Sequence, residues 1–489
     1  MSHVNASQAQ ATLDDDGALV AASGSFSSPI QIIELIEEIM SYLLEPDLLS
    51  AARVCKTWSE PALNRLWRNL FSLVPLLSLI APVQSHNDED MDFIHDIDGA
   101  DWSRYAFYVH RIRNIDLSDF PQQRPMSVRA VKKYADSIPP HLATALVTSL
   151  STFSVSPTPL PLHVVPFISQ SLRELCLIFS FLVESTHHSS SVCVRSMVAA
   201  VSAAAALPNP SLQYFKLSGH AAGTDLCTAI TECLAKHQST IYKLALDVPI
   251  DHQVWRSICN LPFVREVGVT PFSRSELGNS ARIIPMLDEL VKAKPLLERL
   301  RVSLPAAGFG PVEEPDLYRR IIRQLLGLHS LRSVGIYASA PISLSENDVR
   351  EMGASWPQIR TVRLQAHIAW FTPGQMAETD LCILPHFLRH FPYLEELDLP
   401  LRCDNLPRAE QPTTKLLLGV LEVSGSPAPK VDTEQVAAYL ASALPPSTRI
   451  KGSFILSGGE AKARWEEIIR RYDTIRKADR QSATSALPT

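Results

Sequence analysis

The stretch LERLRV at residues 297–302 places Leu297, Leu300 and Val302 in the spacing apolar-x-x-apolar-x-apolar, which returns along most of the chain. Alternate residues of an extended chain point to the same side, so the spacing predicts a short β-strand with one buried face. Eleven such phrases are present, beginning at residues 112, 150, 172, 212, 241, 264, 297, 331, 359, 394 and 418. Their uneven spacing indicates a repeat with a loose period.

Helix-like segments precede several of these phrases. Residues 281–296, 316–330 and 378–393 come before the phrases at 297, 331 and 394. A short strand alternating with a helix is the unit of a leucine-rich-repeat solenoid, which lengthens without enlarging its core. A chain of 489 residues is too long for one ordinary globular core, but a repeat array can accommodate this length. We therefore expect an α/β fold, with a plain α/β domain of short parallel strands as the alternative.

The N-terminal region predicts three short helices. Residues 32–43 carry apolar side chains on one helical face, and Pro46 then interrupts the pattern. Asp47 can cap a second helix that runs to Trp58, and Pro61 fits the first turn of a third helix that includes Trp67. So small a unit cannot bury all of its large apolar groups, which predicts a surface for a partner. The alternative is that these helices only cap the following domain.

Residues 33–70, IELIEEIMSYLLEPDLLSAARVCKTWSEPALNRLWRNL, resemble an F-box. The resemblance implies docking to a Skp-type adaptor and, through it, to a cullin in a Skp-Cullin-F-box ubiquitin ligase. The Leu-Pro pair that usually opens the motif is replaced here by Gln31, Ile32 and Ile33. We expect Trp58 at the adaptor interface and Trp67 in the core. The positions that match the family's adaptor-facing residues are Leu35, Ile39, Leu43, Leu48, Leu49, Val54 and Trp58.

The repeats resemble those of F-box proteins with degenerate leucine-rich repeats, of the divergent fungal kind. The Asn or Cys that usually follows the strand in such repeats is missing from these phrases. The resemblance implies a short N-terminal three-helix F-box followed by an irregular leucine-rich-repeat solenoid. The expected divisions are a disordered tail at 1–27, the F-box at 28–72, a linker or loop at 73–102, the solenoid at 103–455, and a C-terminal helix and tail at 456–489.

Polar positions inside the phrases would line the concave sheet of a solenoid, the usual binding surface of such arrays. Basic residues gather between 299 and 363, and acidic residues between 395 and 422. The segregation suggests a protein substrate of complementary charge, whose identity the sequence does not give. The substrate-binding candidates are Arg299, Arg301, Arg360, Arg363, Glu395 and Asp398.

Composition argues against several other classes. A net charge of -6 gives no broad basic field for nucleic acid, and no apolar run is long enough for a membrane span. The eight cysteines show no disulfide or metal-binding spacing, which favours the cytoplasm or nucleus. Cys382, His386 and His390 could share one helical face, but Pro385 interrupts it, so we expect no metal site.

No phosphate-binding loop, nucleophile elbow or HExxH motif occurs, so we expect no catalytic residue and no cofactor. The sequence thus favours a non-enzymatic substrate receptor of a ubiquitin ligase, binding the adaptor through one part and a protein target through the other. An adaptor-independent repeat scaffold is the first alternative. An enzyme with an unrecognised site is the second.

Overall fold

A computed structural model describes the chain in two compact units, Met1–Trp67 and Arg68–Thr489. The predicted disordered tail at 1–27 lies outside the described residues. The described residues are 33–86, 90–118, 126–139, 142, 147–154, 167–179, 187–219, 223–270, 280–304, 316–338, 342–366, 379–406, 417–452 and 459–485.

The first unit consists of three helices, α1 (Ile33–Tyr42), α2 (Glu45–Ala51) and most of α3 (Lys56–Arg68). Pro46 lies in the first turn of α2, where its missing N–H breaks no helical hydrogen bond. Leu43, Ala52, Trp58 and Leu66 pack around the edge of the core. The core itself is formed by Ile36, Met40, Leu48, Ala51 and Ala62.

The third helix begins earlier than the sequence predicts. The Cys55 carbonyl accepts the backbone N–H groups of Trp58 and Ser59, at 3.2 and 2.9 Å, so Trp58 belongs to the first turn of α3 and not to the second helix. Pro61 lies inside α3 and is buried. The preference of proline for a first turn misplaced this boundary, because Pro61 is buried within α3 even though it cannot donate a helical hydrogen bond.

The second unit is built on a 13-stranded sheet in the order β1-β4-β5-β6-β7-β8-β9-β10-β11-β12-β13-β14-β15. Every neighbouring pair in it is parallel. The strands are β1 (Asn69–Leu70), β4 (Asn114–Ser118), β5 (Ser149–Ser154), β6 (Glu174–Phe179), β7 (Tyr214–Ser218), β8 (Lys243–Pro249), β9 (Glu266–Thr270), β10 (Arg299–Ser303), β11 (Ser333–Ala338), β12 (Thr361–Ala366), β13 (Glu396–Asp398), β14 (Val420–Glu422) and β15 (Arg449–Lys451).

Each of the eleven phrases contains or overlaps one of these strands, which confirms the strand predictions. The phrase at 150 is out of register: Leu150 pairs with Ile115, the fourth position of the phrase at 112, so the equivalent phrase begins at the buried Val147. The end strands β1 and β15 were not predicted. Around β15 only Ile450 is apolar at the three expected positions, because Ser447 and Gly452 occupy the other two.

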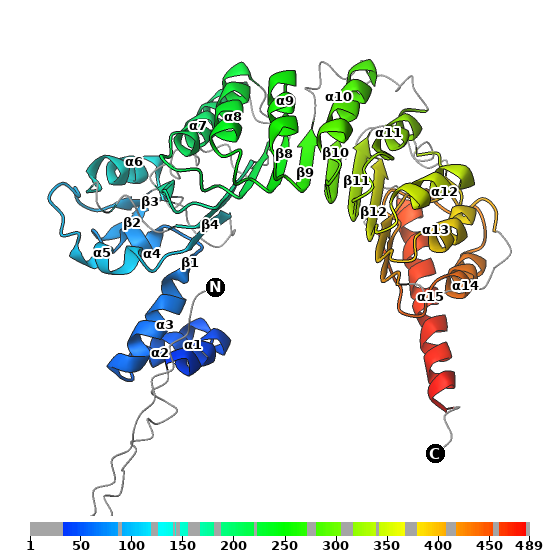
Figure 1. Ribbon diagram of the computed structural model, residues 1–489. Coiled ribbons are helices and arrows are strands. Elements are labelled where there is room, and N and C mark those ends of the chain that lie inside the picture. The colour runs from blue at the N-terminus through cyan, green and yellow to red at the C-terminus, as the bar shows by residue number, and fades with distance from the viewer. Residues whose placement is uncertain are drawn as a thin grey trace, which may run out of the picture. The chain divides into compact units, whose positions relative to one another are not determined.

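Helices alternate with the strands, and α7 to α13 lie on one side of the sheet (Figure 1). This arrangement confirms an α/β fold with three N-terminal helices followed by an irregular solenoid of the leucine-rich-repeat type. The helices before the C-terminal one are α4 (Val74–Leu77), α5 (Ser103–Val109), α6 (Val128–Ser137), α7 (His187–Ala205), α8 (Thr224–Lys236), α9 (His252–Asn260), α10 (Ser280–Ala293), α11 (Leu317–Leu325), α12 (Glu346–Ser355), the 3-10 helix η5 (Leu381–Ile383), α13 (Leu384–His390) and α14 (Thr433–Ala443).

The segment 73–102 is not a plain linker. It contains α4 and an antiparallel strand pair, β2 (Val83–His86) and β3 (Asp90–Phe93). Leu76, Leu77 and Ile97 are fully buried. The acidic residues of the segment suggested a solvated loop. Its buried apolar residues instead pack it within the second unit.

Hydroxyl groups just before several strands bind the main chain of the preceding repeat. The Thr240 hydroxyl donates to the Leu212 carbonyl at 2.7 Å, and the Ser211 hydroxyl donates to Leu172 at 2.8 Å. Thr148 and Thr448 make equivalent bonds to Arg113 and Leu418, at 3.2 and 2.7 Å. Each bond satisfies a carbonyl of the preceding repeat, so Ser and Thr hydroxyls join neighbouring repeats.

A long helix, α15 (Gly459–Ser485), closes the second unit at its C-terminal end and packs on α14. Trp465 is fully buried and donates from Nε1 to the Pro427 carbonyl at 2.9 Å. The Tyr472 hydroxyl donates to the Thr448 carbonyl at 2.9 Å. The helix thus covers the apolar end of an array that would otherwise expose its last repeat.

Candidate interaction surfaces

The predicted adaptor-facing residues divide into three groups. Leu35, Leu49 and Val54 are exposed, the last by 66%. Ile39, Leu43 and Trp58 are half-buried, and Leu43 and Trp58 pack against the core. Leu48 is only 5% exposed and belongs to that core, so its expected position on the surface is wrong. Its place on the inner side of α2 leaves Leu49 as the outward residue of the pair.

Other exposed apolar residues of this unit were not predicted. Tyr42 follows Leu35 and Ile39 on one side of α1, while Leu44 lies in the turn before α2. Of the fourteen exposed large apolar side chains in the described chain, six lie in the first unit, in its helices and in the turns between them. Contiguous exposed apolar groups are typical of interaction surfaces. The six are Ile33, Leu35, Tyr42, Leu44, Leu49 and Val54.

Trp67 is half-buried, so its expected place in the core is not observed. Trp58, in contrast, packs against the core of the first unit. Helix α3 therefore contributes both tryptophans without burying either completely.

The sheet has an open face on the side away from the helices. Buried residues such as Leu300 and Val302 point towards the helices, and the residues between them point to the open face. The parallel register aligns equivalent positions of successive strands in rows. One row reads Lys216, Ala245, Gly268, Arg301, Gly335, Arg363 and Asp398, and the row beside it reads Tyr214, Lys243, Glu266, Arg299, Ser333, Thr361 and Glu396.

Most of the predicted substrate-binding residues form ion pairs across neighbouring strands. The Arg363 guanidinium binds Glu396 through two oxygens, each 2.9 Å from Nη2, and this bond raises the pKa of Arg363. Arg360 lies 2.7 Å from Glu395 at the start of the same strands. The basic and acidic groups separated in sequence therefore neutralise each other where β12 meets β13, which spacing along the chain did not reveal.

Arg299 and Lys243 share a single carboxylate, Glu266, at 3.6 and 3.2 Å. Arg301 is exposed, and its guanidinium lies over the Tyr337 ring, 4.7 Å from the centroid. No carboxylate among the described residues forms an ion pair with Arg301. Among the described residues, Arg301 is therefore a positive charge on the open face without an ion-pair partner.

Asp398 is only 1% exposed, so its expected position as a solvent-facing contact is wrong. Gln365 Nε2 donates to Asp398 Oδ2, while Oδ1 has no hydrogen-bond partner among the described groups. Burial, reinforced by the charge of Glu422, raises the pKa of Asp398 to about 7. The side chain is a buried carboxyl that ionises near neutral pH.

The three candidate metal ligands do not share one helix. Cys382 lies in η5, whereas His386 and His390 lie in α13, which has Pro385 in its first turn. Across the described ranges, no three His, Cys, Asp or Glu side chains form a group that could hold a metal ion. No helix in the described part of the chain is long and apolar enough to cross a membrane.

Comparison with known proteins agrees with the N-terminal assignment. Residues 33–72 match the family model described as F-box-like. No curated protein matches the chain. One similar solved structure is the leucine-rich repeat-containing protein LegL7 from Legionella pneumophila, at 13% identity and a TM-score of 0.33, over 73% of this chain and 98% of that chain. The chain thus combines an F-box-like segment with a repeat sheet, an architecture of protein-interaction modules.

Proposed function

We propose that this protein is the substrate-recognition subunit of a Skp-Cullin-F-box ubiquitin ligase. The observation that carries the proposal is the F-box-like match at 33–72 on a three-helix unit rich in exposed apolar side chains. The repeat unit supplies a second surface, for a protein target. Such a receptor raises the effective concentration of the target near the transferring enzyme and catalyses no reaction itself.

Within this function, each surface has its own residues. Leu35, Leu49 and Val54 contact the adaptor directly, while the half-buried Ile39, Leu43 and Trp58 shape the same surface. The open face of the sheet holds the target, and the cytoplasm or nucleus is where the complex would act. The irregular repeats fit the divergent fungal kind of F-box protein.

An adaptor-independent scaffold is the second candidate. One observation favours it: Ile32 and Ile33 stand where the family usually has its Leu-Pro pair. In that case the apolar surface of the first unit would bind a partner other than a Skp-type adaptor.

Binding of the purified chain to a purified Skp-type adaptor separates the two candidates. The test variant is Leu35→Ala, Leu49→Ala, Val54→Ala, which truncates exposed side chains and spares the core. Truncation of a central interface residue typically weakens the binding free energy by about 2 kcal/mol or more. The affinity for the adaptor should therefore fall at least about 100-fold. The matched control is Phe263→Ala, Leu296→Ala, Tyr393→Ala, three apolar residues of the second unit that are 54 to 75% exposed.

The control variant should retain the affinity of the wild type. A folded wild-type chain that binds no adaptor would favour the scaffold. Circular dichroism and thermal unfolding of all three proteins check that the first unit remains folded.

A further inference from the structure

A buried carboxyl lies near the C-terminal end of the sheet, where β13 runs between β12 and β14. Asp398 of β13 is only 1% exposed, and the register places it between Arg363 on β12 and Glu422 on β14. Residues in register on parallel strands point to the same side of the sheet, with their backbones about 4.8 Å apart. Asp398 therefore has a cationic side chain on one side and a second carboxyl on the other.

The hydrogen bonds around Asp398 leave one of its oxygens without a donor. Gln365 Nε2 donates to Oδ2, whereas Oδ1 is buried and has no hydrogen-bond partner among the described groups. Glu422 is half-buried, and one of its oxygens accepts the Ser424 hydroxyl at 2.8 Å. An ionised Asp398 would leave a buried anionic oxygen unsatisfied beside another carboxylate, which is unfavourable. A proton on Oδ1 removes this cost and makes that oxygen a donor.

The other charged side chains of these three strands are Arg363, Glu396 and Glu422. Arg363 binds both carboxylate oxygens of Glu396, each 2.9 Å from Nη2, so its guanidinium is engaged by that residue. Glu422 and Glu396 oppose the ionisation of Asp398, while Arg363 favours it. Lys451 on β15 is in register with Glu422 and lies one strand farther from Asp398. Asp398 thus ionises only against two neighbouring negative charges.

We propose that Asp398 and Glu422 share one proton and act as a pH switch on the open face of the sheet. In the protonated state, Oδ1–H of Asp398 donates to the Glu422 carboxylate and joins β13 to β14. Loss of the proton leaves two carboxylates facing each other, and Arg363 is the only cationic side chain on these three strands. Arg363 then divides its N–H groups between Glu396 and Asp398, which changes the charge pattern of the open face.

The switch operates near neutral pH. Burial, reinforced by Glu422, raises the pKa of Asp398 to about 7. The pair of carboxyls therefore carries one negative charge below about pH 6 and two above about pH 8. A basic group bound to this part of the face is held more tightly at the higher pH, and an acidic group less tightly. The inference concerns the repeat unit alone and does not rest on the proposed function.

Infrared difference spectroscopy of the full chain detects the shared proton directly. A protonated carboxyl has a C=O stretching band that carboxylates lack, and ordinary Asp and Glu side chains are ionised above about pH 6. We expect the spectrum of the wild type minus that of Asp398→Asn to show this band at pH 6 and to lose it with a midpoint of about pH 7. The matched control is Asp404→Asn, which should give no band, because Arg402 and Lys430 bind that carboxylate and lower its pKa.

Two neighbouring variants test whether the proton is shared. Glu422→Gln removes the facing negative charge and should lower the midpoint by about one pH unit or more. Arg363→Gln removes the favourable cation and frees the charge of Glu396, so it should raise the midpoint. If Asp398 had only a structural role, neither substitution would move the midpoint.

Absence of the band from the difference spectrum at pH 6 would overturn the proposal. A midpoint that is the same in Glu422→Gln and in the wild type would overturn it as well, because the proton would then belong to Asp398 alone. Circular dichroism checks that each variant is folded. Glu422 is half-buried, so Glu422→Gln should fold even where Asp398→Asn does not, and its midpoint against that of the wild type then decides.

Discussion

Individual polar side chains hold the irregular repeats together. His237 is fully buried; its Nδ1 accepts from the Ser211 N–H at 3.2 Å, so Nε2 donates to the Ala204 carbonyl at 3.0 Å. Burial lowers the pKa of His237, which keeps the ring neutral in this role. Lys294 is buried as well and donates to the Leu261 carbonyl. Because different residue types make these bonds, no single sequence signal marks them.

The Thr240 hydroxyl tests this account of how repeats are joined. Thr240→Val removes the 2.7 Å bond to the buried carbonyl of Leu212 and leaves that oxygen without its donor. We expect the free energy of unfolding to fall by about 1 to 3 kcal/mol. Thr228→Val is the matched control, because that hydroxyl bonds only within the exposed side of α8 and should change stability by less than about 0.5 kcal/mol. Equal effects in urea unfolding would contradict the account.

Asp398 makes stability depend on pH. Its folded-state pKa is about 7, above the ordinary 3.8, so its neutral form stabilises the fold. That contribution is complete below pH 3.8 and is lost as pH rises to about 7. Between these two pH values Asp398 ionises in the unfolded chain but stays neutral in the folded protein, which favours unfolding. Glu422 and Glu396 oppose its charge, while Arg363 favours it.

We therefore expect Asp398→Asn to become more stable relative to the wild type as pH rises from about 4 to about 7. The difference in free energy of unfolding should level off above about pH 7. Thermal unfolding of both proteins across this range measures it. A difference that is independent of pH would show that Asp398 ionises normally in the folded protein.

At the scale of elements, helix boundaries depend on tertiary burial more than on local signals. Pro61 suggests a helix start but lies inside α3, and the polar segment 73–102 folds around a few apolar anchors. The sequence predicts a C-terminal helix within 456–489, and the function of that helix as a cover depends on Trp465, Ile468 and Tyr472, which are fully buried. Burial of these large side chains is what holds α15 on the repeat unit.

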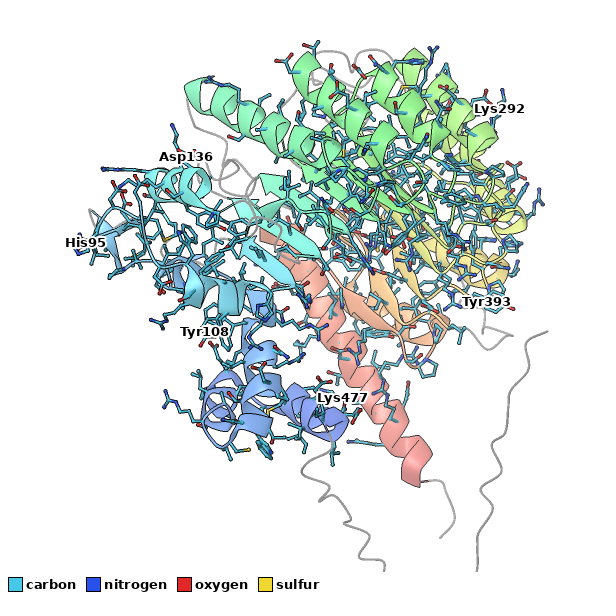
Figure 2. The ribbon with its side chains drawn as sticks, turned by 60° about the vertical axis from the view of Figure 1, so that its left-hand side comes forward. His95, Tyr108, Asp136, Lys292, Tyr393 and Lys477 are labelled. Atoms are coloured by element: carbon cyan, nitrogen blue, oxygen red, sulfur yellow. The ribbon has the colours of Figure 1, made fainter. Side chains whose placement is uncertain are left out.

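Truncating Trp465 should therefore weaken the C-terminal end of the array. We expect Trp465→Ala to lower the free energy of unfolding by about 3 to 5 kcal/mol, since it removes a buried indole and its bond to Pro427. Lys477→Ala, an exposed residue of the same helix (Figure 2), should change stability little. Hydrogen exchange of α14 and β15 shows where the loss falls. Unchanged protection there would mean that α15 does not cover the end of the array.

At the scale of the whole molecule, the repeat spacing was sufficient to predict the sheet, because Leu300 and Val302 and their equivalents recur wherever a strand is buried. The spacing could not locate β1 or β15, because Ser72 breaks the apolar pattern at β1 and Ser447 and Gly452 break it at β15. It also could not show that Arg360 and Arg363 face Glu395 and Glu396, since register brings together residues far apart in sequence. Likewise, helical periodicity alone did not separate the buried Leu48 from the exposed Leu49.

The central claim is that one surface binds an adaptor and another binds a target. Affinity capture of the full chain from cells, with quantitative mass spectrometry, tests it most directly. We expect the wild type to capture a Skp-type adaptor and a cullin, and Leu35→Ala, Leu49→Ala, Val54→Ala to lose both together. Arg301→Glu should retain both at wild-type levels. A folded wild-type chain that captures neither adaptor nor cullin would contradict the receptor account.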